Sequence, residues 1–455
     1  MLSFLLLTRE ANTMKVDQKR RWKMFVAAGA TMALVAGMVS TVPSVYAGGT
    51  IKADEDKWIS IGMGTRQSIN MREDGSASGA QWSNDFKIDN ARIYINGGIH
   101  KYVKFAFNTE CFNCNTGGGG TPGTGGTGQF ASNSNIGLLD AIGQFEFNEL
   151  VNFWIGRTLI PTDRGELNGP YYHAVFDGFR TPLGPSDFSG NFPQGGAGVN
   201  GAGVYGRDNG VVFFGKVHPG GTHLQYVASV FTGLRSGAGF GPNQRNSLKY
   251  AGRLTWNLLN DESNPGYYTS GTYYGTAGDI LAIAAGGEYQ NAGAGSFANQ
   301  SAFGSFVSDL LFEKVLDNNN GKTNGVFTFN AEYKRYWAQS LAAWAANALG
   351  GPGDCFCMFS GTSVTAYALY LFPNEVGIGR FQPYGRYTFV NSVHSSALDE
   401  FELGMNYVIS GHNARISTYY RNGNLATNGG FLGAAPGPTT GQHQDSIHLA
   451  LQLQY

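Results

Sequence analysis

The last nine residues of the chain, IHLALQLQY (447–455), decide its fold class. Four apolar residues, from Ile447 to Leu453, alternate with His448, Ala450, Gln452 and Gln454, and an aromatic residue, Tyr455, comes last. Successive side chains of a strand point to opposite faces, so the segment predicts a β-strand with one apolar and one polar face. A half-buried strand of a soluble β-sandwich would show the same alternation, and the rest of the chain has to distinguish the two.

The same alternation recurs along the chain. Fifteen further segments show it: 58–68, 86–99, 103–110, 141–148, 152–160, 209–218, 222–233, 247–259, 279–290, 303–316, 325–337, 362–372, 380–391, 400–410 and 413–422. Short turns and long loops alternate between them, which is typical of an outer-membrane barrel. Closure of the last strand on the first would leave no unpaired edge. We therefore predict an all-β protein, a transmembrane antiparallel β-barrel of about sixteen strands in the bacterial outer membrane.

One connection does not fit this scheme. Residues 261–278 should form a short periplasmic turn, yet the segment is long and rich in tyrosine. We expect either a periplasmic insertion or a hairpin that the strand count has missed.

The composition agrees with a barrel. Only 14% of the 455 residues are charged, whereas aromatic residues reach 13% and glycines number 67. Few charges with many aromatic residues suit a sheet that faces lipid on one side and water on the other. The formal net charge of -1 gives no support for nucleic-acid binding.

The N-terminal region predicts a secretory signal peptide over 1–47. Basic residues at 19–23 precede an apolar run over 24–39, and Val45-Tyr46-Ala47 offers a small-residue cleavage site. A membrane anchor is the alternative, but the apolar run is short for a span. Met14 is the more natural start of translation. We expect a short N-terminal periplasmic segment at 48–57 and the barrel over 58–455.

The segment 161–208 is the longest stretch without a strand pattern, and it shows no helix pattern either. It holds eleven glycines and five prolines between two strand segments, and seven aromatic residues give it apolar surface to pack. A loop held inside the mouth of the barrel would explain both features. We interpret it as the pore constriction, and the candidate lining residues are Asp163, Arg164, His173, Asp177, Arg180 and Arg207.

Two blocks of sequence resemble a known family. The first combines NARIYINGGIHKYVKFAFNTE (90–110) with FWIGRTLIPTDRGEL (153–167), and the second combines RFQPYGRYTFVNS (380–392) with DEFELGMNYVISGHNARISTYYRN (399–422). Both resemble the phosphate-selective porin O and P family of sixteen-stranded outer-membrane channels. The resemblance implies a homotrimer in the lipid bilayer and lipopolysaccharide, with a long third loop folded into the lumen. It also implies passive diffusion of small hydrophilic solutes or ions, anions such as phosphate among them.

The charge pattern leaves the ion preference open. Alternation places nine basic residues in the lumen wall: Arg66, Arg92, Lys104, Lys249, Arg253, Lys334, Arg386, Arg415 and Arg421. It places six acidic residues there: Glu110, Glu146, Asp309, Glu313, Glu332 and Glu402. The constriction segment adds three arginines against five acids, namely Asp163, Glu166, Asp177, Asp187 and Asp208. Rings of like charge set ion preference, so phosphate selectivity is not carried over; each lumen charge could instead belong to a wall ion pair.

Four cysteines form two close pairs, Cys111 with Cys114 and Cys355 with Cys357. Disulfides are expected in an oxidising compartment, and a soft-metal site of four thiolates is the alternative. The second alternative motivates a rival function, in which the barrel is a sheath or anchor for an electron-transfer or metal-binding partner. No cofactor and no enzymatic activity are predicted, because no catalytic motif or converging catalytic pair emerges from the sequence.

Overall fold

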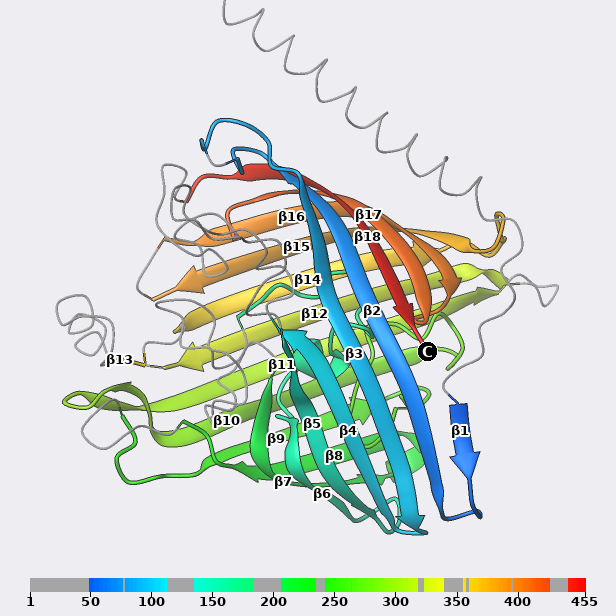
Figure 1. The fold of residues 1–455 in the computed structure, drawn as a ribbon, viewed down its shortest axis with the longest axis vertical. Coiled ribbons are helices and arrows are strands. Elements are labelled where there is room, and N and C mark those ends of the chain that lie inside the picture. Colours follow the sequence, from blue (N-terminus) through cyan, green and yellow to red (C-terminus); the bar gives the residue numbers. More distant parts are fainter. Residues whose placement is uncertain are drawn as a thin grey trace, which may run out of the picture. The chain divides into compact units, whose positions relative to one another are not determined.

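A computed structural model gives the structure of residues 49–76, 78–112, 135–182, 206–234, 242–262, 264–317, 323–338, 355–356, 360–393, 396–425 and 441–455. Sixteen antiparallel strands form a closed barrel in this part of the chain (Figure 1). The first eight are β2 (Trp58–Arg72), β3 (Asp85–His100), β4 (Val103–Phe112), β5 (Asn135–Glu146), β6 (Asn152–Leu159), β7 (Arg207–Val217), β8 (His223–Phe231) and β9 (Lys249–Asn257). The others are β10 (Ile280–Ser296), β11 (Gln300–Asp317), β12 (Thr323–Trp337), β14 (Gly361–Leu371), β15 (Arg380–Ser392), β16 (Leu398–Ser410), β17 (Ala414–Gly423) and β18 (Gln444–Gln454).

The ring closes where the sequence places its clearest strand. β18 pairs with β2 from Ser446 opposite Arg72 to Gln454 opposite Gly64. Each of the sixteen predicted strands overlaps one strand of the ring, so the predicted barrel and its strand number are confirmed.

Two short strands lie outside the ring. β13 (Cys355–Phe356) pairs with the end of β10, while β12 pairs directly with β14. β1 (Gly49–Lys52) pairs with Trp58–Ile61, the part of β2 that β18 does not reach. The segment expected at 48–57 thus contributes a strand that covers an otherwise open edge. Residues 1–48, with the predicted signal peptide, lie outside the described residues.

The two faces of each strand differ in polarity as the alternation predicts. On β2, Ile61 and Met63 are 50% and 61% exposed on the outer face, whereas Arg66 is buried inside. Exposed apolar residues continue around the ring, for example Leu254, Phe306 and Leu403. A closed barrel with an apolar outer face satisfies its backbone within a bilayer, which identifies the chain as an outer-membrane protein. No helix in the described ranges has the length and apolarity to cross a membrane.

The described residues of the long segment 261–278 hold no strand, so the segment is an insertion and not a hairpin, but it folds into the lumen and not into the periplasm. β9 pairs directly with β10, with Asn257 opposite Ala282. The segment leaves the barrel end that carries the short turns 101–102, 147–151 and 411–413, and then enters the lumen. Tyr267 is fully buried there, with its ring centroid 5.3 Å from that of Trp154. We call the described residues of this segment, 261–262 and 264–278, the inner loop.

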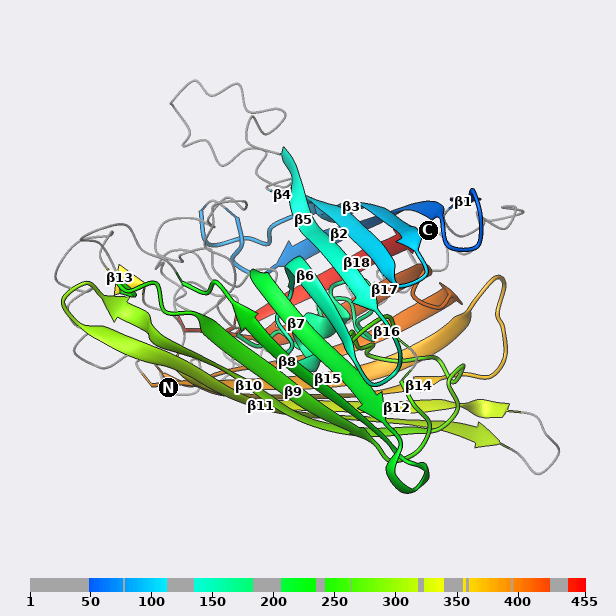
Figure 2. The same cartoon turned by 90° about the horizontal axis from the view of Figure 1, so that it is seen from below.

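The connection from β6 to β7, the third loop of the opposite end, also lies in the lumen. Its described residues, 160–182 and 206, are here called the constriction loop. α2 (Arg164–Asn168) lies inside the ring of strands (Figure 2). Val175, Phe176 and Phe179 of this loop form an apolar cluster with Tyr367 and Tyr384 of the wall. Burial of these aromatic rings holds a glycine- and proline-rich segment in place without a strand of its own. Phe188, Phe192 and Tyr205 lie outside the described residues.

A second apolar cluster lies beside β6 and β7. Trp154 and Phe214 of these strands pack with Leu167 of α2 and Tyr267 of the inner loop. Both loops are therefore anchored to the wall by apolar packing as well as by polar contacts.

Gly156 of β6 allows a close approach that any other residue would prevent. Its φ is +129°, and an added Cβ would lie 2.0 Å from the carbonyl oxygen of Ala141. We expect Gly156→Ala to lower the free energy of unfolding by about 1–3 kcal/mol or more. Gly385→Ala, whose Cβ would meet no atom closer than 3.4 Å, should stay within about 0.5 kcal/mol. Urea unfolding of both variants in lipid vesicles, monitored by circular dichroism, measures the difference in stability. Equal unfolding midpoints of the two variants would contradict this prediction.

Candidate functional site: the barrel lumen

The constriction loop begins with a single helical turn that the sequence prediction missed. Asp163 caps α2, since its carboxylate accepts a hydrogen bond from the backbone N–H of Glu166 at 2.7 Å. The segment was expected to hold no helix, and this expectation is wrong. Asp163 followed by Glu166 three residues later is the signature of a helix N-terminus, and it could have revealed the turn.

Arg164 joins three parts of the molecule. Its Nη1 and Nη2 each donate to Glu262 of the inner loop at 2.7 Å, and Nη1 also donates to the carbonyl of Ser270 at 3.0 Å. Its Nε donates to Asp309 of β11 at 3.0 Å. Arg164 and Asp309 have no exposed side-chain surface. This guanidinium therefore crosslinks the two loops and the barrel wall.

Asp163 also reaches the wall. Its carboxylate lies 3.1 Å from Lys334 of β12, and Lys334 lies 3.2 Å from Glu332. Glu332 in turn accepts hydrogen bonds from the backbone N–H of Gly165 and from the hydroxyl of Thr181. Both ends of the described constriction loop are thus held by one patch of β12.

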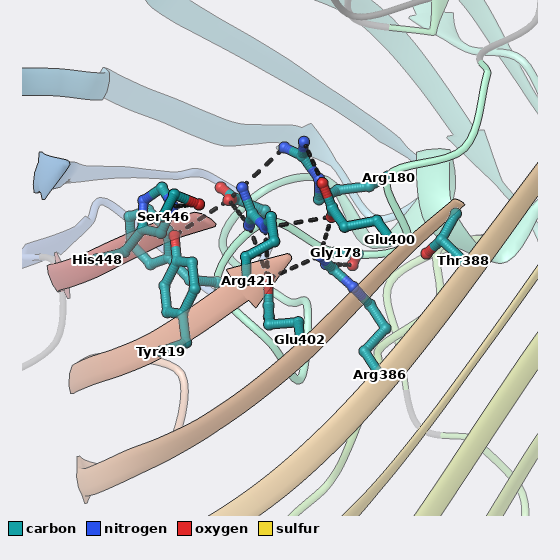
Figure 3. A network of polar contacts seen from close by, with 12 residues as sticks. Gly178, Arg180, Arg386, Thr388, Glu400, Glu402, Tyr419, Arg421, Ser446 and His448 are labelled. Carbon is teal, nitrogen blue, oxygen red and sulfur yellow. Dashed lines mark hydrogen bonds and ion pairs between the residues drawn. The ribbon is translucent and has the colours of Figure 1, made fainter. Parts of the chain in front are cut away.

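Arg180 belongs to a network of arginines and acids on β15, β16 and β17 (Figure 3), and Asp177 joins it through Arg421. Arg180 pairs with Glu400 at 2.7 Å, and Arg386 pairs with both Glu400 and Glu402. Arg421 bonds Glu402 and Asp177 together. The three arginines of this network face three carboxylates, so they leave little free charge at this side of the lumen.

Two loop groups have shifted pKa values. Burial raises the pKa of Asp177, but the guanidinium groups of Arg421 and Arg180 outweigh it and hold that pKa well below its usual range. Burial, with the charges of Arg66 and Arg415, lowers the pKa of His173 to about 3. His173 is therefore neutral at physiological pH and adds no charge to the lumen.

Arg66 and Arg415 differ from the other lumen arginines. Arg415 donates to the carbonyls of His173 and Ala174, both at 2.9 Å. Arg66 donates to the carbonyl of Phe176 and lies 3.9 Å from the centroid of that ring. Both side chains are buried, and within the described ranges neither has a carboxylate at ion-pair distance. They clamp the backbone of the constriction loop, and the acids that act on the charge of Arg66, namely Asp177 and Asp89, do so without a direct ion pair.

The remaining candidates lie on the wall. Arg207 is a correction to the prediction, because it is the first residue of β7 and pairs with Asp140 of β5 at 2.9 Å. Its side chain therefore belongs to the wall and not to the loop. The other wall pairs are Arg92 with Glu110, Lys104 with Glu146, Lys249 with Asp208 and Glu288, and Arg253 with Asp309.

Three of the five acids in the segment 161–208 are paired with cations of the wall in the folded protein. Asp163, Asp177 and Asp208 each lie beside a wall cation, namely Lys334, Arg421 and Lys249. Asp187 lies outside the described residues. Counting loop charges alone is therefore a poor guide to the field in the lumen, since the wall supplies the opposite charges.

Sequence reasoning missed four acids that hold this lumen: Asp140, Glu262, Glu288 and Glu400. Glu400 could have been found, because it lies two residues before Glu402 and so on the same face of one strand. Glu262 could not, because the inner loop has no strand pattern to place it.

Cys111 is disulfide-bonded. In that state it offers no thiolate to a metal ion. Cys355 begins β13, whereas Cys114 and Cys357 lie outside the described residues, so the pairing of the four cysteines stays a prediction. Among the residues that the structure describes, no group of three or more His, Cys, Asp or Glu side chains is placed to hold a metal ion.

One hydroxyl–imidazole contact lies at the turn end of the lumen. The Oγ of Ser270 is 3.0 Å from Nε2 of His412. The hydroxyl donates to the carbonyl of Thr272, and Nδ1 of His412 has no partner in the described part of the chain. In an activated nucleophile a third group orients the base, and no described residue takes that position at Nδ1 of His412.

Comparisons with known proteins show what this chain is similar to. No protein-family model and no curated protein matches the chain. An anion-selective porin from Comamonas acidovorans is 13% identical, covering 88% of this chain and 100% of its own, with a TM-score of 0.49. The outer membrane channel DcaP of Acinetobacter baumannii is 12% identical, covering 90% and 100%, with a TM-score of 0.46. OprB of Pseudomonas putida is 8% identical, covering 87% and 94%, with a TM-score of 0.49.

Such low identities and TM-scores carry no argument about function. The assignment as an outer-membrane barrel rests on the strand pairing and the apolar outer face of this chain. Membership of the phosphate-selective porin O and P family stays a prediction.

Proposed function

We propose that this protein is an outer-membrane porin through which small hydrophilic solutes or ions diffuse passively. The supporting observation is a closed sixteen-stranded barrel whose inner face carries charged side chains and whose third loop lies in the lumen. Size exclusion at the constriction loop and the field of the lumen charges would select the solute. Arg164, Arg180, His173, Asp163 and Asp177 shape the constriction in this proposal.

The proposal includes a preference for anions, phosphate among them. Arg66 and Arg415 support it, because each is a buried guanidinium whose hydrogen bonds go to neutral groups. A buried charge without a counter-ion is costly, and a permeating anion would relieve that cost. Asp163 and Asp177 of the described loop already pair with cations of the wall, so these two acids do not oppose this field. Lipopolysaccharide contacts and a homotrimer belong to the same proposal and rest on the family resemblance.

Planar-bilayer recording of the purified, folded protein tests the proposal. We expect ion-permeable channels, and in a salt gradient a reversal potential of the sign that chloride permeation gives. Folded protein without conductance would refute the porin. A reversal potential of the opposite sign would refute only the anion preference.

Arg415→Gln should reduce the preference for anions. It removes a positive charge but keeps a donor for the loop carbonyls. The permeability ratio of chloride to potassium should fall by up to about fivefold, the factor that about 1 kcal/mol of interaction gives. Arg415→Lys keeps the charge and is the matched control, with a ratio close to the parent value. An equal fall in both variants would assign Arg415 a purely structural role.

A further inference from the structure

The inner loop crosses the lumen from one side of the barrel to the other. At β6 the hydroxyl of Tyr267 donates to the carbonyl of Leu159 at 2.6 Å and lies 2.8 Å from the hydroxyl of Thr158. Near β17 the ring of Tyr274 lies 4.9 Å from that of His412. β6 and β17 are the fifth and the fifteenth strands of the sixteen in the ring. Backbone that spans this interval removes cross-section from the channel.

A single carboxylate on β11 holds the middle of the crossing. Glu313 accepts hydrogen bonds from the hydroxyl of Thr272 at 2.6 Å, from the N–H of Tyr273 at 3.0 Å and from the N–H of Gly275 at 2.8 Å. Gly275 has a φ of +81°, and this conformation belongs to the turn that presents the donors to one point. Glu313 is fully buried, and in the described part of the chain no cation lies at ion-pair distance from it. The hydrogen-bond donors of the inner loop are therefore the main contacts that stabilise the buried Glu313 carboxylate.

The inner loop also packs directly against the constriction loop. The N–H of Gly271 donates to the carbonyl of Tyr172 at 2.8 Å, and the hydroxyl of Thr269 donates to Asn168 at 2.7 Å. Arg164 adds the paired bonds to Glu262 described above. The two loops therefore touch one another inside the lumen, and each enters from a different end.

We propose that the inner loop is a second restriction element, in series with the constriction loop, and that Glu313 is the latch that keeps it across the lumen. The proposal rests on the proposed porin function. Resistances in series add, so both segments set the conductance and the largest solute that passes. The constriction loop alone cannot account for the selectivity of a channel built in this way.

The two ends of the inner loop lie close together, so the loop can be deleted without moving β9 or β10. The N–H of Asn260 donates to the carbonyl of Asp279 at 3.1 Å, so the two ends of the loop are already adjacent. Replacing residues 264–277 by two glycines retains Glu262 as a partner of Arg164. We expect the single-channel conductance to rise at least twofold, and larger sugars to enter liposomes in a swelling assay.

Point variants test the same proposal if the deletion variant does not fold. Glu313→Gln keeps the shape of the side chain but replaces one acceptor oxygen by a donor, so it should raise the conductance and increase current fluctuations. Thr276→Val is the matched control on the same loop, because its exposed hydroxyl bonds only to the carbonyl of Tyr273. It should leave the conductance unchanged. Heat-modifiable migration on gels verifies that each barrel is folded.

The outcomes separate the two proposals. A parent protein that conducts, with the same conductance and solute limit in the folded deletion and Glu313→Gln variants, would overturn the second restriction element alone. A folded parent and a folded deletion variant that both lack conductance would overturn the porin function itself. A parent that conducts poorly and a deletion variant that conducts well would support the inner loop as the narrower of the two elements.

Discussion

Arg164→Met should lower the free energy of unfolding of the barrel by about 3–5 kcal/mol, because it leaves the buried Glu262 without its cation. Glu262 would keep only the hydroxyl of Tyr273, at 2.9 Å, as a described partner. Asp309 would keep Arg253. Urea unfolding in lipid vesicles, followed by circular dichroism, measures the change.

Two controls sharpen this measurement. Lys104→Met breaks an ion pair with Glu146 in which both side chains are partly exposed, and it should cost at most about 1 kcal/mol. Glu262→Gln in the Arg164→Met background removes the orphaned charge and should restore part of the loss. Equal costs for Arg164→Met and Lys104→Met, or no recovery in the double variant, would show that Arg164 is not the crosslink of the two loops.

Trp154→Ala should be destabilising by about 3–5 kcal/mol, the range for removing a fully buried aromatic side chain. The indole packs against Phe214, Tyr267 and Tyr268, each with ring centroids 5.3 Å away, and its Nε1 donates to Glu146. The loss would fall on the cluster that anchors the inner loop to β6. The same unfolding assay measures it.

Trp256→Ala is the comparison for this variant. Trp256 lies on the outer face, 49% exposed, with one hydrogen bond to the hydroxyl of Thr222. Its removal should cost about 1 kcal/mol, close to the worth of that bond. A larger loss at Trp256 than at Trp154 would show that packing inside the barrel contributes little to its stability.

The strands of the barrel were predictable because each strand's pattern of apolar and polar residues depends only on its own sequence. An outer-membrane strand must place apolar side chains in lipid and polar side chains inside, and this alternation can be read from Ile61, Met63 and Arg66 without knowing any neighbour. The same rule placed the lumen charges of β11, β12 and β16 on the inner face. It also placed most strand ends within four residues, since apolar residues stop where the lipid stops, but the start of β5 and the end of β10 each differ by six residues.

The structures of the two loops in the lumen were harder to predict from the sequence than the strands. The constriction loop was located by elimination, but its one-turn helix was missed, and Arg207 was assigned to the loop although it belongs to β7. The sequence analysis recognised the inner loop only as a connection that is too long for a periplasmic turn. Its course depends on Glu313, Trp154 and Arg164, which are far from it in the sequence.

The alternating segments that end in IHLALQLQY by themselves determined a sixteen-stranded outer-membrane barrel, because lipid on one side and water on the other impose a period of two on every strand. Only the tertiary structure decided which charges in the lumen have no direct ion pair. Pairing across the lumen neutralises Asp163, Asp177 and Asp208 and leaves Arg66 and Arg415 with neutral partners. Ion pairs depend on distances between residues that are remote in the chain, and no periodicity of the sequence records those distances.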